Sequence, residues 1–300
     1  YSQAKALREL RDYAKSIKKD FLMAANINPP GNPLGGTSIK VHGEVLDFLL
    51  LEAGYTRIGW PRERVYRANA FSYLYTRAAT SCPSALDAYP DETTDKEIFW
   101  SPKDVKLFLA EARAFGGTLM YSLFAVTKDV PAVWTGPFFQ QRCGEWLVNC
   151  LLRAYHEEAS RLLTSGQRWE DVAKILSKKL DPSNEAIALY NGFFRENKDC
   201  YEGVEPYVQV MLLCSVPTIE WHYGSSLQKY RELEGCLQLL LDANILFNII
   251  TDEQVPEMGE GLLILPDPAC LSEQTIEKIM KFRSNRGNLL AVGQPGKYTE

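Results

Sequence analysis

Polar side chains follow several short apolar runs in the first half of the chain. These residues are Asn26, Asn28, Glu52, Arg77 and Tyr121, with Tyr55 shortly after Glu52. A short apolar run is typical of a buried strand, and parallel strands present functional side chains at their carboxyl ends. A carboxylate at such an end can act as an acid, a base or a nucleophile, and amide, guanidinium or phenol groups can orient a substrate beside it.

Glu52 is the strongest of these candidates because it ends the run "DFLLL" at 47–51, which is too short for a surface helix. Two interpretations fit: a buried strand whose last residue faces a pocket, or a carboxylate that stands at a strand end by accident. An ionised carboxylate without a partner is unstable in an apolar interior. We therefore expect Glu52 to project into a cleft, near a donor such as Arg77 or Asn28.

The elements that would position these residues alternate between helix and strand over residues 1–145. Strands are predicted at Phe21–Ala25, Phe48–Leu51, Phe71–Tyr75 and Thr118–Phe124. Helical spacing from Leu7 to Ile17 predicts a helix before the first strand, and Ser101 with Pro102 starts another. Strands separated by helices favour a parallel sheet. We therefore expect the four strands to be neighbours, with Asn26, Glu52 and Arg77 on the same edge of the sheet.

The remainder of the chain divides into a helical connection at 146–204 and a second α/β module at 205–300. Strands of this module are predicted near 207–214, 247–250, 262–265 and 288–292. Asn244 is placed to stop one helix and Ser272 to cap another. The order of elements predicts an open doubly wound domain. No Gly-rich phosphate loop lies between a strand and a helix, so a nucleotide is not indicated.

Composition excludes several classes of function. The chain is 46% hydrophobic and 24% charged, as in ordinary globular proteins, and its net charge of -5 without a Lys/Arg block argues against nucleic-acid and anionic-membrane partners. The longest apolar patch, 237–250, is too short and too interrupted to span a bilayer. Seven scattered cysteines without a CxxC pair favour a reducing, cytoplasmic setting, and three distant histidines indicate no metal site. No cofactor is expected.

Three segments of the second module carry a resemblance to a known family. They are "YNGFFRENKDCYEGVEPYVQVMLLCS" (190–215), "LLLDANILFNIITDEQV" (239–255) and "GLLILPDPACLSEQTIEKIMKFRSNRGNLLAVG" (261–293). Together they resemble the amidotransferase-like, trimerisation-like domain that follows the barrel in family 42 β-galactosidases and related glycosyl hydrolases. The resemblance implies an α/β chain in which the C-terminal part of a (β/α)₈ barrel precedes a doubly wound flavodoxin/amidotransferase-like domain.

The same resemblance implies a glycosidase that acts on a carbohydrate with two carboxylates, an acid/base after the fourth barrel strand and a nucleophile near the seventh. Glu52 fits a late-strand carboxylate, but "EAGY" departs from the family's nucleophile context. Nucleophile, substrate clamp and structural carboxylate therefore all remain open for Glu52. The other carboxylate is expected upstream of Tyr1, because the chain begins inside a helical pattern and looks like a fragment.

Alternatives stay open for the other candidates. Asn26 and Asn28 fit hydrogen bonds to sugar hydroxyls or ordinary turn chemistry, and Tyr55 fits a stacking platform or the core. Arg77 fits a partner of Glu52 or of an anionic substrate, or a surface arginine. Cys270 lacks the glycine-flanked elbow and nearby His of an amidotransferase nucleophile. A non-catalytic relative of the hydrolases, retained for carbohydrate binding or for assembly of a homo-oligomer, is the alternative function.

Overall fold

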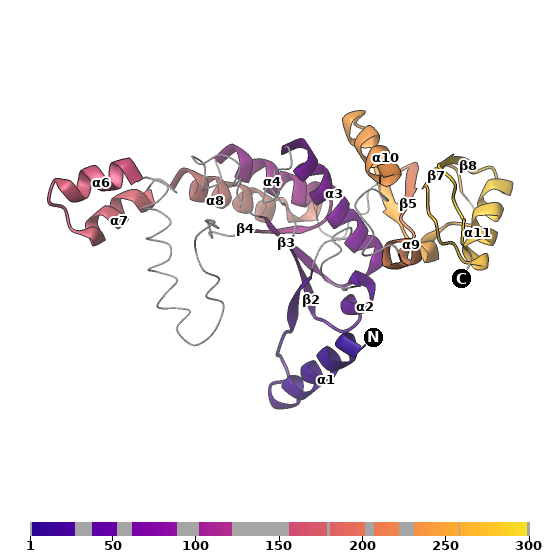
Figure 1. The fold of residues 1–300 in the computed structure, drawn as a ribbon, viewed down its shortest axis with the longest axis horizontal. Coiled ribbons are helices and arrows are strands. Elements are labelled where there is room, and N and C mark those ends of the chain that lie inside the picture. The colour runs from indigo at the N-terminus through magenta and orange to yellow at the C-terminus, as the bar shows by residue number, and fades with distance from the viewer. Residues whose placement is uncertain are drawn as a thin grey trace.

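The computed structural model describes residues 2–27, 38–52, 62–88, 102–121, 156–178, 181–201, 207–221, 231–257 and 259–298. Within these ranges the chain forms two four-stranded parallel sheets with helices between and around them (Figure 1). An α/β chain with parallel sheets is thus confirmed.

The first sheet, sheet A, has the strand order β1-β2-β3-β4. Its strands are β1 (Ala24–Ile27), β2 (Phe48–Glu52), β3 (Ser84–Ala88) and β4 (Thr118–Tyr121). The intervening helices are α1 (Ser2–Ile17) before β1, then α2 (Ile39–Gly43), α3 (Arg62–Ala79) and α4 (Pro102–Ala114). Every strand pair is parallel, so all four carboxyl ends meet at one edge of the sheet.

The predicted strand Phe71–Tyr75 is wrong, because these residues lie inside helix α3. The third strand is β3, which begins thirteen positions after Phe71. Residues 72–76 of α3 are all buried, and five consecutive residues point to every side of a helix. A helix that is buried all round shows no 3.6-residue pattern, so its aromatic-rich sequence was taken for a strand.

The other strands of sheet A lie close to their predicted positions. β2 starts at Phe48 as predicted and ends on Glu52 itself. β1 is displaced towards the carboxyl side and includes Asn26, whereas Phe21 precedes it. β4 begins at Thr118 as predicted, after Gly116 ends α4 in the left-handed conformation.

The second sheet, sheet B, has the order β6-β5-β7-β8. Its strands are β5 (Val210–Leu213), β6 (Phe247–Ile250), β7 (Leu262–Pro266) and β8 (Asn288–Val292), and its helices are α9 (Val216–Trp221), α10 (Arg231–Asp242) and α11 (Glu273–Ser284). All pairs are parallel, as a doubly wound domain requires. Asn244 adopts a positive φ of 52° after α10, and the Ser272 hydroxyl accepts from the Thr275 amide at the start of α11, as predicted.

Three further helices connect the sheets. They are α6 (His156–Thr164), α7 (Trp169–Ser177) and α8 (Asp181–Glu196). Helix α8 packs along α4, and Phe194 of α8 is buried with Phe108 and Leu109 of α4. Helices α6 and α7 pack on each other, on the side of α8 away from sheet B (Figure 1).

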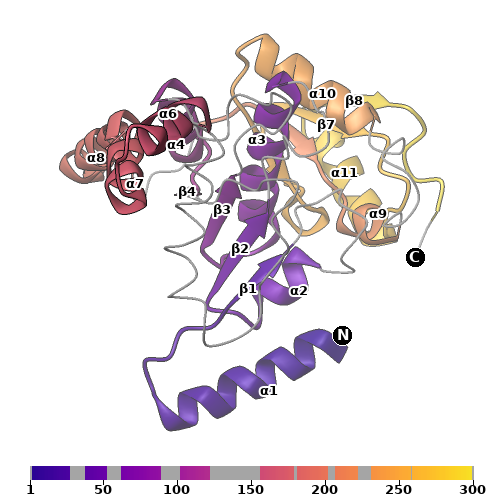
Figure 2. The same cartoon turned by 60° about the vertical axis from the view of Figure 1, so that its left-hand side comes forward.

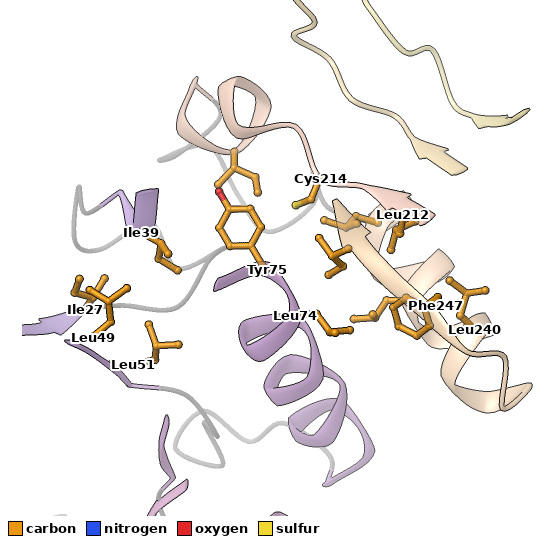
Figure 3. Packing of buried hydrophobic residues seen from close by; sticks show 14 of the residues in the cluster. Ile27, Ile39, Leu49, Leu51, Leu74, Tyr75, Leu212, Cys214, Leu240 and Phe247 are labelled. Carbon is orange, nitrogen blue, oxygen red and sulfur yellow. The ribbon is translucent and has the colours of Figure 1, made fainter. Parts of the chain in front are cut away.

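One hydrophobic cluster joins the two sheets. It contains Leu49 and Leu51 of sheet A and Leu212 and Ile249 of sheet B, with Tyr75 and its neighbours on α3 between them (Figure 3). Helices α2 and α3 lie on the side of sheet A that faces sheet B (Figure 2). The two sheets thus share a core, and α3 belongs to both.

This shared core predicts a large effect of Leu237→Ala. Leu237 of α10 is 3% exposed inside the cluster, whereas Leu239, two residues further along the same helix, is 71% exposed. Truncation of a buried leucine leaves a cavity, so Leu237→Ala should lower the free energy of unfolding by about 2–5 kcal/mol. Leu239→Ala should stay within roughly 0.5 kcal/mol of the parent. Denaturant unfolding of both variants checks this, and similar midpoints for the two would contradict it.

Candidate active site

The carboxyl edge of sheet A brings two acidic residues together. Glu52, the last residue of β2, is the register partner of Asp87 on β3. Tyr121, the last residue of β4, pairs with Ala88 one position further along. Neighbouring strands lie about 4.8 Å apart, so the backbones of Glu52 and Asp87 are adjacent at the edge where parallel sheets place chemistry.

The two faces of sheet A differ in how closely helices pack against them. Ile27, Leu49, Leu51 and Leu86 are each at most 1% exposed, and they form the face on which the helices pack. Alternate residues lie on the other face, where Asn26 is exposed, Phe48 is 36% exposed and Leu50 is partly buried. Positions 52 and 87 continue this second set along their strands. By this alternation, Glu52 and Asp87 occupy neighbouring strand positions on the face that the described helices leave uncovered.

Sequence reasoning missed Asp87. Its strand has the sequence "SALDA" and follows "SCP", so small and turn-forming residues surround one strongly apolar residue, Leu86. Leu86 is nonetheless 0% exposed. The available signal was the spacing: a parallel strand must stand between the end of α3 and the start of α4.

Other predicted site residues have different outcomes. Asn26 lies within β1 opposite Leu50, and it therefore stands two residues short of the row that holds Glu52. Tyr121 ends β4 as expected. Asn28 and Tyr55 lie outside the described residues.

The prediction that Arg77 shares an edge of the sheet with Glu52 is wrong. It stands in the last turn of α3, and its guanidinium lies beside Gly116, where an added Cβ would be 3.1 Å from Nη1. Gly116 lies two residues before the start of β4, so Arg77 is at the amino-terminal edge of sheet A. The helix that follows a strand returns the chain to that edge, so a residue near its end cannot share the edge with Glu52.

Cys270 behaves as a structural residue. It is 5% exposed after β7, and its backbone is held by the Thr218 hydroxyl, which accepts from the Cys270 amide at 2.9 Å. Ser215 and Thr218 both donate to the Cys270 carbonyl. These bonds fix the loop after β7 against the loop after β5.

Two kinds of feature are absent from the described part of the chain. No group of three or more His, Cys, Asp or Glu side chains within it could hold a metal ion. Among the same residues, no helix combines the length and apolar character needed to cross a bilayer.

The fold is similar to that of a known enzyme. No protein-family model matches the chain, and no curated protein matches its sequence. Among solved structures, it is similar to the β-galactosidase from the psychrophilic Marinomonas ef1, with a TM-score of 0.55 and 12% sequence identity. The match covers 99% of this chain and 43% of that protein, so the chain spans less than half the length of the β-galactosidase. At this identity the similarity establishes the fold alone.

Proposed function

We propose that this chain is part of a glycoside hydrolase whose active site lies at the carboxyl edge of sheet A. The adjacent positions of Glu52 and Asp87 at that edge are the observation that carries the proposal. Glycoside hydrolysis needs two carboxyl groups on either side of the scissile bond, because one protonates the leaving oxygen while the other stabilises or attacks the sugar carbon. The fold similarity to a β-galactosidase supports the same chemistry.

The uncovered face of sheet A supports a barrel arrangement. Phe48 and Leu50 on this face are apolar, and none of the described helices lies over them. Within the described residues β1 pairs on one side only, with β2. An unpaired strand edge and an exposed apolar face both favour aggregation. In folded proteins the edge is normally paired with another strand and the face is normally covered. Four further strands that extend the sheet beyond β1 would close it into a barrel and turn this face inward.

In that arrangement β1–β4 are the last four barrel strands, so β2 is the sixth and β3 the seventh. Asp87 then stands where the family 42 resemblance implies a nucleophile, and Glu52 stands one strand earlier. We accordingly propose Asp87 as the second carboxylate of the pair with Glu52, in place of the acid/base that the family pattern implies upstream. Asn26, Asn28, Tyr55 and Tyr121 are proposed to contact the carbohydrate substrate.

An activity assay on the full-length protein tests this proposal. We expect hydrolysis of at least one aryl glycoside from a panel of β-galactoside, β-glucoside, α-galactoside and β-mannoside substrates. The control is Glu44→Gln, an exposed carboxylate at the end of α2 that should keep full activity. Absence of hydrolysis across the panel by a folded protein would contradict a catalytic role.

Carbohydrate binding without catalysis is the second candidate. Its support is the "EAGY" context of Glu52, which departs from the nucleophile context of the resembled family. This function predicts that the folded protein binds a sugar at the carboxyl edge of sheet A and turns over none of the panel. Loss of binding in Asp87→Asn with no turnover by the parent would favour it.

A further inference from the structure

A polar cavity lies where the carboxyl ends of sheet B meet helix α2 of the first half of the chain. Its volume is about 260 Å³. Val216 follows β5, Thr251 follows β6, and Ser272 and Lys278 belong to the segment after β7, while Lys40 comes from α2. In open α/β sheets, the crevice outside the carboxyl ends of the strands is where ligands bind.

The charges in the cavity wall balance one another. The ammonium of Lys40 donates to the Glu253 carboxylate, and this bond is the main cause that raises the pKa of Lys40. Lys278 Nζ donates to the Glu253 carbonyl at 3.0 Å, and Asp252 accepts from the Val216 amide at 2.7 Å. The wall thus carries two ammonium groups and two carboxylates, and a ligand with a net charge would find no excess of opposite charge.

Hydroxyl and amide groups occupy the rest of the polar wall. Ser272 and Thr275 share a hydrogen bond of 2.9 Å, Thr251 is joined to Gln254, and Gln274 is exposed beside them. Because a ligand hydroxyl donates and accepts at once, it can bridge an ammonium to a neighbouring carboxylate or hydroxyl. A ligand carboxylate only accepts, so it could not donate a hydrogen bond to Asp252 or Glu253.

We infer that this cavity binds a small, neutral, polyhydroxyl ligand of about monosaccharide size. The volume is somewhat below the roughly 300–1,000 Å³ of drug-sized ligand sites, which fits a single sugar ring. Since Lys40 belongs to the first half of the chain and the other wall residues to the second, the bound ligand would contact both. The inference goes beyond the proposed function, because it concerns the second module and needs no hydrolytic activity.

Titration of the full-length protein with D-galactose, D-glucose and glycerol, followed by calorimetry and ligand-detected NMR, tests the inference. Gln274→Trp fills the cavity from an exposed wall position, so it should weaken sugar binding at least about tenfold without unfolding the protein. Glu277→Trp is the matched control, an exposed residue of the same helix outside the cavity wall, and it should bind as the parent does. Binding should also persist in Asp87→Asn, the variant expected to lose binding if the sugar occupied the carboxyl edge of sheet A instead.

Three results would overturn the inference. One is the absence of sugar binding in the parent, and another is equal binding by Gln274→Trp and Glu277→Trp. The third is binding of inorganic phosphate in place of sugars, abolished by Lys278→Met and by added salt, which would identify an anion site. None of these results depends on whether the protein hydrolyses a glycoside, so they leave the proposed function to its own assay.

Discussion

Glu52→Gln in the full-length protein should lower turnover of its best aryl glycoside by about 10²–10⁴-fold, the usual contribution of a positioned acid or base. The substitution keeps the shape of the side chain and removes its charge. Glu52 stands at the end of β2 rather than inside the strand, so the midpoint of thermal unfolding should change little. The measurement is kcat and KM together with an unfolding curve for the same preparation.

Asp87→Asn should give a loss of similar size, because the proposed chemistry needs both carboxylates. Arg77→Ala should retain activity, since Arg77 lies beside Gly116 at the opposite edge of sheet A. Full turnover in Glu52→Gln together with a lower melting temperature would identify a structural carboxylate. A loss in Glu52→Gln alone, with Asp87→Asn unchanged, would return the second carboxylate to the upstream part of the protein.

Sequence patterns predicted the elements whose burial is one-sided or whose ends carry a clear signal. Sheet B is the best example: all four of its strands were located, and Asn244 and Ser272 act as the helix boundaries they were expected to be. These signals are local, because a cap or a left-handed residue acts on its own backbone. The same holds for β2, whose apolar run ends on Glu52 as expected.

The incorrect predictions share a different cause, because contacts between residues far apart in the sequence determine the structure at those positions. Residues 72–76 of helix α3 are all buried because this part of the helix packs in two hydrophobic clusters, and only the three-dimensional arrangement reveals this. Because part of this helix was predicted as a strand, Arg77 was predicted at the wrong edge of sheet A and β3 was not predicted. The pairing of Glu52 with Asp87 depends on the register of β2 and β3, which neither strand encodes alone.

The interior between α3 and α4 predicts that stability falls as the pH rises. Glu111 of α4 accepts a hydrogen bond from Asn69 Nδ2 at 3.2 Å, and burial raises the pKa of its carboxyl from 4.5 to about 8, against a smaller opposing effect of that bond. Nearby, burial and the proximity of Glu111 raise the pKa of Tyr73, whose hydroxyl lies 3.5 Å from the Thr118 carbonyl. Glu111 is thus a partly buried acid that the folded protein keeps protonated up to a pH of about 8.

The sign of the effect follows from the two pKa values. Below pH 4.5 the Glu111 carboxyl is protonated in both states and contributes no pH dependence. Between pH 4.5 and about 8 the unfolded chain releases the proton while the folded chain retains it, so the free energy of unfolding decreases with rising pH. Each unit of pKa difference between the two states corresponds to about 1.4 kcal/mol of stability. Since the Glu111 side chain keeps some exposure, we expect less than this full amount, a total loss of roughly 2–4 kcal/mol between pH 4.5 and about 8.

Glu111→Gln should remove this dependence, because a neutral amide has no proton to release. Near pH 5 the variant and the parent should have similar stability, and near pH 9 the variant should be the more stable by roughly 2–4 kcal/mol. Urea unfolding at both pH values measures the difference, and the exposed Glu277→Gln serves as the control for a change of charge alone. A stability difference between Glu111→Gln and the parent that stays constant from pH 5 to pH 9 would show that Glu111 ionises normally in the folded protein, with water or a cation reaching its carboxylate between the two helices.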